Sequence, residues 1–173
     1  MEKNMVSSES LKIILFSIFA ACIYGIVHDM VTAHVCVEYF LPPVHPIIIS
    51  TTNPILLALV WGIVATWWVG LFLGIPLAFV CRFGSRPKLM VKNVMRPMLT
   101  LLVFLYVASL LLGGIGYVMG LLGLWCIPPY FETHIVPERY ARFQFNLFAH
   151  EAAYLFGAIG GIVLMVRLWK KRG

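Results

Sequence analysis

Residues 54–80 read PILLALVWGIVATWWVGLFLGIPLAFV, an apolar run that contains no charged side chain. An α-helix needs about 20 apolar residues to cross the ~30 Å hydrocarbon core of a bilayer, so this run is long enough to span it. Lipid offers the backbone no hydrogen-bond partners, and an open chain can therefore cross only as a helix that bonds within itself. The stretch predicts a transmembrane helix over residues 54–81.

Three further runs of the same kind bring the number of apolar segments to four. Membrane-spanning strands would alternate apolar and polar residues over about ten positions, and none of the four runs alternates in this way. We therefore expect an all-α fold, a four-transmembrane-helix bundle that forms a single integral membrane domain over residues 1–173. The predicted helices cover residues 8–29, 54–81, 97–124 and 145–168.

The composition of the whole chain agrees with a membrane protein. Of its 173 residues, 61% are hydrophobic and 12% are charged, whereas a soluble domain carries about 25% charged residues. A soluble core of this size could not hide so much apolar surface from water, so lipid is the expected solvent. The net charge of +6 does not indicate a nucleic-acid partner, because the basic residues flank the apolar runs instead of forming a stripe.

Basic residues are distributed unevenly among the segments that join the four runs. Five lie in residues 82–96 and four in the C-terminal tail, whereas residues 28–53 contain no Lys or Arg and residues 125–144 contain only Arg139 and Arg142. The positive-inside rule then places both termini and the 82–96 link in the cytoplasm. We expect a multi-pass protein of the bacterial inner (plasma) membrane with two small extracytoplasmic loops.

Small residues recur at every fourth position within the runs, most regularly in the second predicted helix. There the series is Gly62, Thr66, Gly70, Gly74 and Ala78. Residues four apart share one helix face, and a small face lets two helix backbones approach closely in lipid. The first helix carries a similar series through Gly25, and the next position in register is Asp29. An acid on a packed face is costly, so Asp29 is expected to be paired or hydrated.

Residues 31–39 alternate strictly between apolar positions and polar or small ones. This period of two, with several β-branched residues, is typical of a strand. Residues 131–135 alternate more briefly, so the two segments are predicted to pair as a short β-ribbon over the outer end of the bundle. A helical continuation of the first segment is the alternative, because no Gly or Pro intervenes before Pro42.

The histidines and most acidic residues gather on the predicted extracytoplasmic side, where all five histidines and five of the seven acids lie. Imidazole and carboxylate groups together are ligands for divalent transition metals, and they also form proton relays. One His-acid pair closes the first helix and another opens the fourth, so the two pairs are expected at the same depth, where they could converge. The candidate metal ligands are His28, Asp29, His34, Glu38, His150 and Glu151.

The four cysteines leave two questions open. Residues 19–22, Phe-Ala-Ala-Cys, loosely resemble a lipoprotein cleavage box, but the apolar run continues past Cys22 through Val27, which favours an uncleaved helix. Cys36 and Cys126 both fall on the predicted extracytoplasmic side, where a disulfide is permitted. The sequence contains no Cys-x-x-Cys pair, which argues against a thiol oxidoreductase.

Three classes of function fit these features. A structural or assembly factor is favoured, in which the His/carboxylate cluster only ties loops to helices. A metal-binding protein or metal-dependent membrane enzyme is the second class, although the spacing of the candidate ligands matches no signature such as His-Glu-x-x-His. A small oligomeric transporter or channel subunit ranks last, because the second and third helices carry few polar side chains. The expected partners are the lipid bilayer and either further copies of the chain or a membrane-protein complex.

Several short motifs resemble those of a known group of proteins. They are YGIVHD at residues 24–29, EYF at 38–40, ATWWVG at 65–70 and HEAAY at 150–154. With these motifs the chain resembles a group of uncharacterised bacterial four-helix integral membrane proteins, and the resemblance extends over most of the chain. It implies a bacterial inner-membrane protein and supplies no activity, substrate or cofactor.

Overall fold

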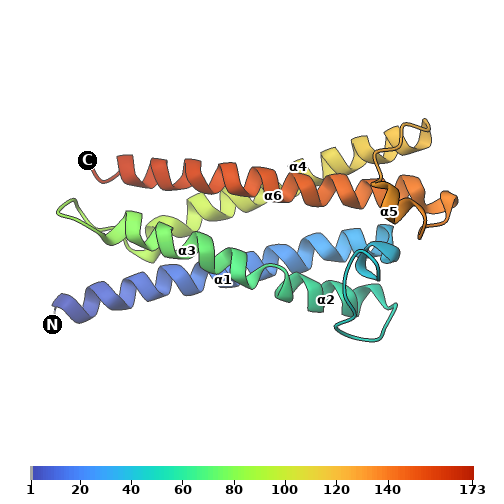
Figure 1. Ribbon diagram of the computed structural model, residues 1–173. Helices are drawn as coiled ribbons and strands as arrows, with labels where there is room; N and C mark the ends of the chain where they lie inside the picture. The colour runs from blue at the N-terminus through green and yellow to red at the C-terminus, as the bar shows by residue number, and fades with distance from the viewer. Residues whose placement is uncertain (1) are drawn as a thin grey trace.

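The protein is a bundle of long helices, shown as a computed structural model in Figure 1, which describes residues 2–173 and the side chains from residue 8 onward. In chain order the elements are α1 (Glu2–Val35), η1 (Val37–Phe40), α2 (Pro54–Val64), α3 (Trp67–Arg82), α4 (Val91–Leu121), α5 (Pro129–Glu132), η2 (Pro137–Arg139) and α6 (Tyr140–Lys170). Four segments are long and apolar enough to cross a membrane, namely Ser8–Val35, Pro54–Arg82, Val91–Leu121 and Pro137–Lys170. The prediction of an all-α, four-helix fold is confirmed, and the chain is a multi-pass membrane protein.

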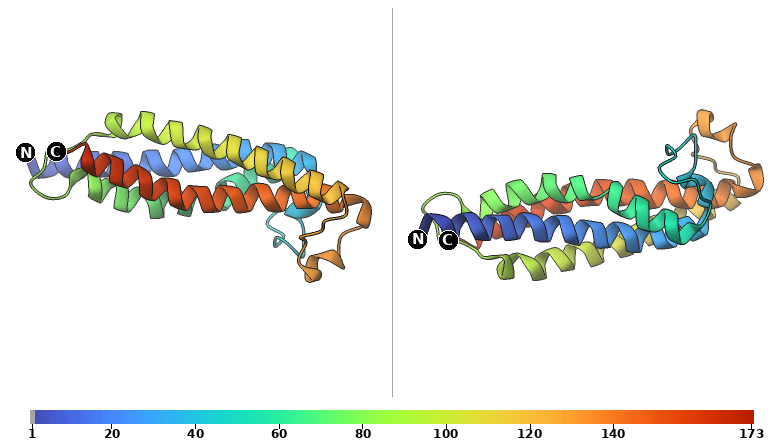
Figure 2. Two further views of the ribbon diagram at one scale, coloured as in Figure 1. Left: turned by 90° about the horizontal axis from the view of Figure 1, so that it is seen from above. Right: turned by 90° about the horizontal axis from the view of Figure 1, so that it is seen from below.

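The two ends of the bundle differ in chemistry. Both termini lie at one end, together with the turn between α3 and α4 (Figures 1 and 2). We call this the basic end, because it holds the basic residues of segments 82–96 and 167–172. The opposite end, formed by residues 28–53 and 122–150, is called the histidine end. The five histidines of the chain all lie there.

The outward faces of the helices are apolar. Phe72, Val103 and Leu111 are 69%, 65% and 65% exposed, whereas Val94 and Ala149 on inward faces are completely buried. Large apolar side chains displayed on this scale are incompatible with water and suit a hydrocarbon solvent. The four spans therefore contact lipid directly, and the polar groups are left for the bundle interior and its two ends.

The predicted β-ribbon is wrong, since no strand occurs among residues 2–173. α1 continues through Val35, and the amide of Cys36 still donates to the carbonyl of Thr32 at 3.0 Å. The second ribbon segment lies in and after the short helix α5. No helix-breaking residue interrupts residues 31–39. The chain therefore forms local helical hydrogen bonds there, although its side chains alternate as in a strand.

The second span is not a single helix. α2 ends at Val64 and α3 begins at Trp67, with Ala65 and Thr66 forming a turn between them. The hydroxyl of Thr66 donates to the carbonyl of Gly62, so a side chain competes with the backbone for this acceptor. The sequence predicted one uninterrupted helix over residues 54–81, and the structure breaks it at this turn.

Glycines set the closest contacts between helices. A Cβ atom on Gly62 would lie 2.5 Å from the backbone nitrogen of Ile26, and one on Gly70 would lie 2.6 Å from a backbone atom of α1. On the other side of the bundle, a Cβ atom on Gly120 would lie 2.6 Å from the Cα of Ala141. α1 therefore packs backbone to backbone on α2 and α3, and α4 does so on α6. The small-residue faces meet within one chain.

Candidate metal centre

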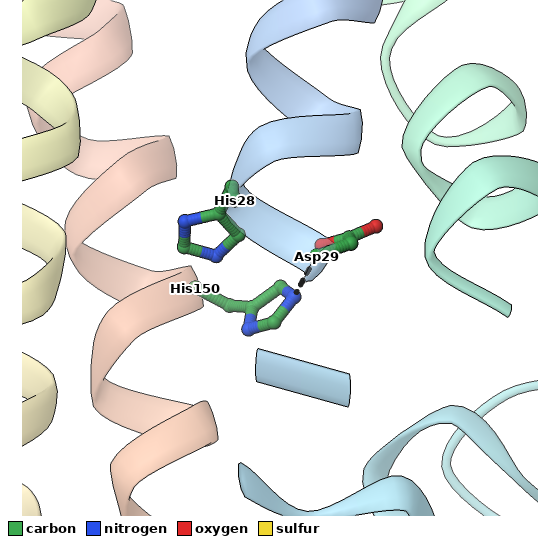
Figure 3. A group of neighbouring side chains, drawn as sticks. All are labelled: His28, Asp29 and His150. Atoms are coloured by element: carbon green, nitrogen blue, oxygen red, sulfur yellow. Dashed lines mark ion pairs between the residues drawn. The ribbon is translucent and has the colours of Figure 1, made fainter. Parts of the chain in front are cut away.

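Three of the predicted site residues converge inside the histidine end of the bundle. His28 and Asp29 lie on α1, His150 lies on α6, and their side chains point toward one another (Figure 3). One potential ligand atom from each residue lies within 4.8 Å of the other two, and all three side chains are buried. The sequence expected the His28-Asp29 and His150-Glu151 pairs to converge, and the structure brings together three of these four side chains.

Asn146 fixes the position of α6 against the end of α1. Its amide nitrogen Nδ2 donates to the carbonyl of Thr32 at 2.9 Å and to the carbonyl of Cys36 at 3.0 Å. Both carbonyls already accept a backbone N–H, so the buried amide bonds to their second lone pairs at the end of α1. Since His150 follows Asn146 by one helical turn, the same contact sets His150 beside His28.

The hydrogen bond at one ring nitrogen of His150 determines which of the two ring nitrogens carries the proton. Nδ1 lies 2.8 Å from the backbone carbonyl of Asn146, and a carbonyl only accepts, so Nδ1 carries the proton. Nε2 lies 3.4 Å from Oδ1 of Asp29. In a neutral imidazole this nitrogen presents a lone pair to a carboxylate, an arrangement that needs a proton or a cation between the two atoms.

His28 is the least satisfied polar side chain of the cluster. Both of its ring nitrogens are buried and have no hydrogen-bond partner among the described residues. The ring stacks on Tyr24, with centroids 5.7 Å apart, and meets His150 edge to face at 4.7 Å. Burying a polar group without a partner costs about 1–3 kcal/mol, so this ring calls for a partner from outside the chain, either a water molecule or an ion.

A cavity of about 50 Å³ adjoins the cluster. It is lined by His28, Asp29 and His150, and also by His45 and Thr66. A water needs only about 10–15 Å³ of such space, so the cavity has room for an ion with a water molecule. His45 completes the lining: its Nδ1 donates to the carbonyl of Tyr39 at 2.6 Å, and burial lowers its pKa, which keeps the ring neutral.

The break between α2 and α3 borders this cavity. Ala65 and Thr66, the two residues of the turn, both belong to its lining. Irregular backbone within a membrane is tolerated only where protein buries it or where it lines a cavity. The interruption therefore lies beside the buried histidine–aspartate cluster, and the Thr66 hydroxyl that bonds to Gly62 belongs to a residue of the same lining.

The other three candidate ligands lie apart from the cluster. His34 is exposed, and its Nδ1 donates to the carbonyl of Met30 at 2.6 Å. Glu38 pairs with Arg139 at 3.4 Å, and Glu151 is exposed on α6. Successive positions on a helix differ by about 100°, and on α6 this rotation points Glu151 away from the face that carries His150 toward α1. This geometry separates Glu151 from His150.

All four cysteines are free thiols in this structure, so the Cys36–Cys126 disulfide is not formed. Cys36 is buried and donates through Sγ to Glu38 at 3.2 Å, whereas Cys126 is exposed. Burial, followed by the hydrogen bond to Glu38, raises the pKa of the Cys36 thiol to about 12. The thiol therefore stays protonated, which makes it a poor metal ligand compared with the neighbouring imidazoles.

Two imidazoles and one carboxylate form a recognised ligand set for divalent transition metals. Three protein ligands leave at least one coordination position open, as in catalytic zinc sites and in iron sites of the two-His, one-carboxylate type. Here the open position would face the cavity that His45 and Thr66 line. The backbone carbonyl bonded to Nδ1 of His150 is the kind of outer partner that holds a metal-bound histidine in one tautomer.

Comparison of the chain with protein-family models, with curated proteins and with solved structures gives no match in any of the three. No family is therefore assigned. The resemblance to bacterial four-helix membrane proteins is supported at the level of four long apolar helices. Since a fold alone does not determine a function, the function has to be inferred from the buried cluster and its surroundings.

Proposed function

We propose that the protein is a multi-pass membrane protein that binds one divalent transition metal ion through His28, Asp29 and His150. The observation that carries this proposal is the state of His28, whose two buried nitrogens have no partner among the described residues. A metal ion would take one of these nitrogens as a ligand. It would also accept the lone pair of His150 Nε2 and balance the charge of the Asp29 carboxylate.

A purely structural hydrogen-bond cluster explains the same residues less well. If His150 were protonated, its 3.4 Å contact with Asp29 would be an ion pair, but His28 would gain nothing from it. Polar networks that serve only to tie elements together are expected to satisfy each member, since a partly satisfied network is costly in a buried site. The assembly role favoured from the sequence alone therefore gives way to the metal-binding role.

The metal would have a coordination position facing a small cavity with both polar and aromatic lining residues, which suits a bound water or a small ligand. Imidazole and carboxylate ligands favour zinc, iron or copper over magnesium and calcium, whose preferred ligands are oxygens. A metal in this position could lower the pKa of its bound water and supply hydroxide within the bundle. His45, held neutral by burial, lines the same cavity and offers an additional proton acceptor.

The metal content of the detergent-purified protein tests this proposal. After dialysis against Zn²⁺ and removal of free metal, the wild-type chain is expected to retain about one equivalent by elemental analysis. His28→Ala and Asp29→Asn should each retain less than about a tenth of that, because each removes a ligand. The matched control is His34→Ala, an exposed histidine of the same helix, which should retain the wild-type amount. A wild-type chain that holds no more zinc than His28→Ala would refute the site.

We further propose that the basic end faces the bacterial cytoplasm and the metal site lies near the extracytoplasmic face. Most basic residues lie at the end that holds both termini, as the positive-inside rule requires of a cytoplasmic face. Cys126 offers a native reporter of this orientation, because it is exposed at the histidine end. A membrane-impermeant maleimide should label it in intact spheroplasts. Cys126→Ser combined with Ser85→Cys should be labelled only after lysis, and the reverse pattern would contradict the orientation.

A transport function has one observation in its favour. A broken helix beside buried ionisable residues is a feature of ion-coupled transporters, and the α2–α3 turn borders the His28 cluster. On the basic side of the cluster, however, the interior cavity of about 110 Å³ is lined almost entirely by apolar side chains, apart from Ser17, Tyr24, Thr66 and Tyr154. An ion would meet few ligands there, so metal binding remains the better-supported function.

A further inference from the structure

A groove of about 710 Å³ lies between α4 and α6 at the basic end. The two helices pack tightly toward the histidine end, where Gly116 and Gly120 contact α6, and they diverge toward the basic end (Figure 2, left). The groove shares no lining residue with the cavity at the metal site. It is therefore a separate feature, independent of the proposed metal-binding function.

Three cations line this groove. They are Arg96 on α4, Arg167 on α6 and Lys171 directly after α6, and all three are exposed. In the part of the chain whose side chains are described, none of the three has an ion-pair partner, and no carboxylate lines the groove. The neighbouring Arg172 is turned inward instead, where it donates to the carbonyls of Phe83 and Pro87 at 2.8 Å each. The groove thus carries concentrated positive charge that the protein leaves uncompensated.

Apart from Thr100, the rest of the groove is apolar, and it ends at an aromatic pair. Phe104 of α4 and Phe156 of α6 meet edge to face, with ring centroids 6.0 Å apart. At 1.5 Å per residue, the helices rise about 12 Å from Arg96 to Phe104 and about 16 Å from Arg167 to Phe156. The hydrocarbon of one leaflet is roughly 15 Å deep, half the thickness of the bilayer core. The apolar part of the groove is therefore as long as one leaflet is deep.

Gly160 keeps the groove open. It lies among the groove-lining residues of α6, and a Cβ atom there would meet the side chain of Leu101 on α4 well inside van der Waals contact. A larger residue at this position would fill the space between the two helices. The groove consequently has a cationic entrance and apolar walls, and the space between its two helices depends on the absence of a side chain at Gly160.

We propose that an anionic phospholipid occupies this groove, with its phosphate among Arg96, Arg167 and Lys171 and one acyl chain running to the Phe104–Phe156 pair. Basic pockets between membrane helices recognise anionic headgroups in this way, and each basic residue near the surface strengthens binding roughly fivefold. A second copy of the chain fits less well, because in a symmetric pair it would present the same three cations at the same depth. The charge complementarity favours the lipid.

Native mass spectrometry of the full-length protein in detergent tests this assignment. The protein is titrated with phosphatidylglycerol or with phosphatidylcholine of identical acyl chains. One phosphatidylglycerol should bind at least about tenfold more tightly than phosphatidylcholine, since only its headgroup is anionic. Arg96→Gln combined with Arg167→Gln should weaken phosphatidylglycerol binding roughly 25-fold. Lys88→Gln combined with Lys170→Gln removes the same charge from exposed residues outside the groove, and it should leave the affinity unchanged.

Gly160→Leu tests the apolar half of the same site without touching the cations. The leucine side chain should displace the lipid from the groove. In a separate assay on the wild-type complex, inorganic phosphate added as a competitor at millimolar concentration should have no effect. Equal affinity for the two lipids, or equal losses in the two double variants, would overturn the assignment. So would a dimer whose crosslinks run through the groove, because a second copy would then be the occupant.

Discussion

Saturating Zn²⁺ is expected to raise the Tm of the detergent-solubilised protein by roughly 10 °C. The three ligands come from α1 and α6, which are brought together only in the folded chain, so the metal binds the folded state preferentially. At a free metal concentration a thousand times the Kd, this linkage contributes about 4 kcal/mol of stability. For a chain of this size, each 1 kcal/mol shifts Tm by about 2–4 °C. Thermal unfolding followed by tryptophan fluorescence, before and after addition of a chelator, measures the shift.

Variants separate this effect from non-specific binding of metal to surface histidines. His28→Ala and His150→Ala should show almost no zinc-dependent shift, because each removes one of the three ligands. His134→Ala should show the wild-type shift, since that histidine is exposed and lies outside the cluster. If His28→Ala were stabilised by zinc as strongly as the wild type, the shift would have to come from other residues and the site would be wrong.

Replacing Gly62 with leucine is expected to destabilise the bundle more than any single change at the metal site. A Cβ atom at this position would lie 2.5 Å from the backbone nitrogen of Ile26, and a backbone atom cannot rotate away as a side chain can. Overpacking of this kind costs about 3 kcal/mol or more, because α1 and α2 must separate along their contact. We expect Tm to fall by roughly 6–12 °C and zinc binding to weaken, since α1 carries two of the ligands.

Gly114→Leu is the matched control for this prediction. Nothing lies within 4 Å of a Cβ atom at Gly114, so a leucine there has open space in which to point. Its Tm is expected to stay within a degree or two of the wild-type value. Equal stability of the Gly62→Leu and Gly114→Leu proteins would show that the close α1–α2 contact does not hold the bundle together.

The fold could be predicted from the sequence to the extent that hydrocarbon thickness determines it. The thickness of the bilayer sets the length that an apolar run needs, so the four spans follow from the length and composition of the runs. The ribbon expected at residues 31–39 was wrong because side-chain alternation is a weak signal where nothing stops a helix. The break at Ala65 and Thr66 was missed, because neither residue is a helix breaker and no proline marks the turn between α2 and α3.

The candidate site was predictable where helix periodicity applies. Asp29 continues the small-residue face of Gly25 by four positions, and the structure buries it at 5% exposure. His45 was not singled out, because it lies in a loop whose path over the cluster follows no repeat. The role of Asn146 in clamping α6 to the end of α1 also depends on tertiary contact.

X-ray absorption spectroscopy at the zinc K edge of the metal-loaded, detergent-purified protein tests the central claim most directly. The account predicts a first shell of nitrogen and oxygen atoms at about 2.0–2.2 Å, with outer-shell scattering from two imidazoles. The imidazole scattering should fall to one ring in any zinc retained by His150→Ala. A first shell containing sulfur at about 2.3 Å, or one with no imidazole scattering, would place the metal elsewhere and contradict the account.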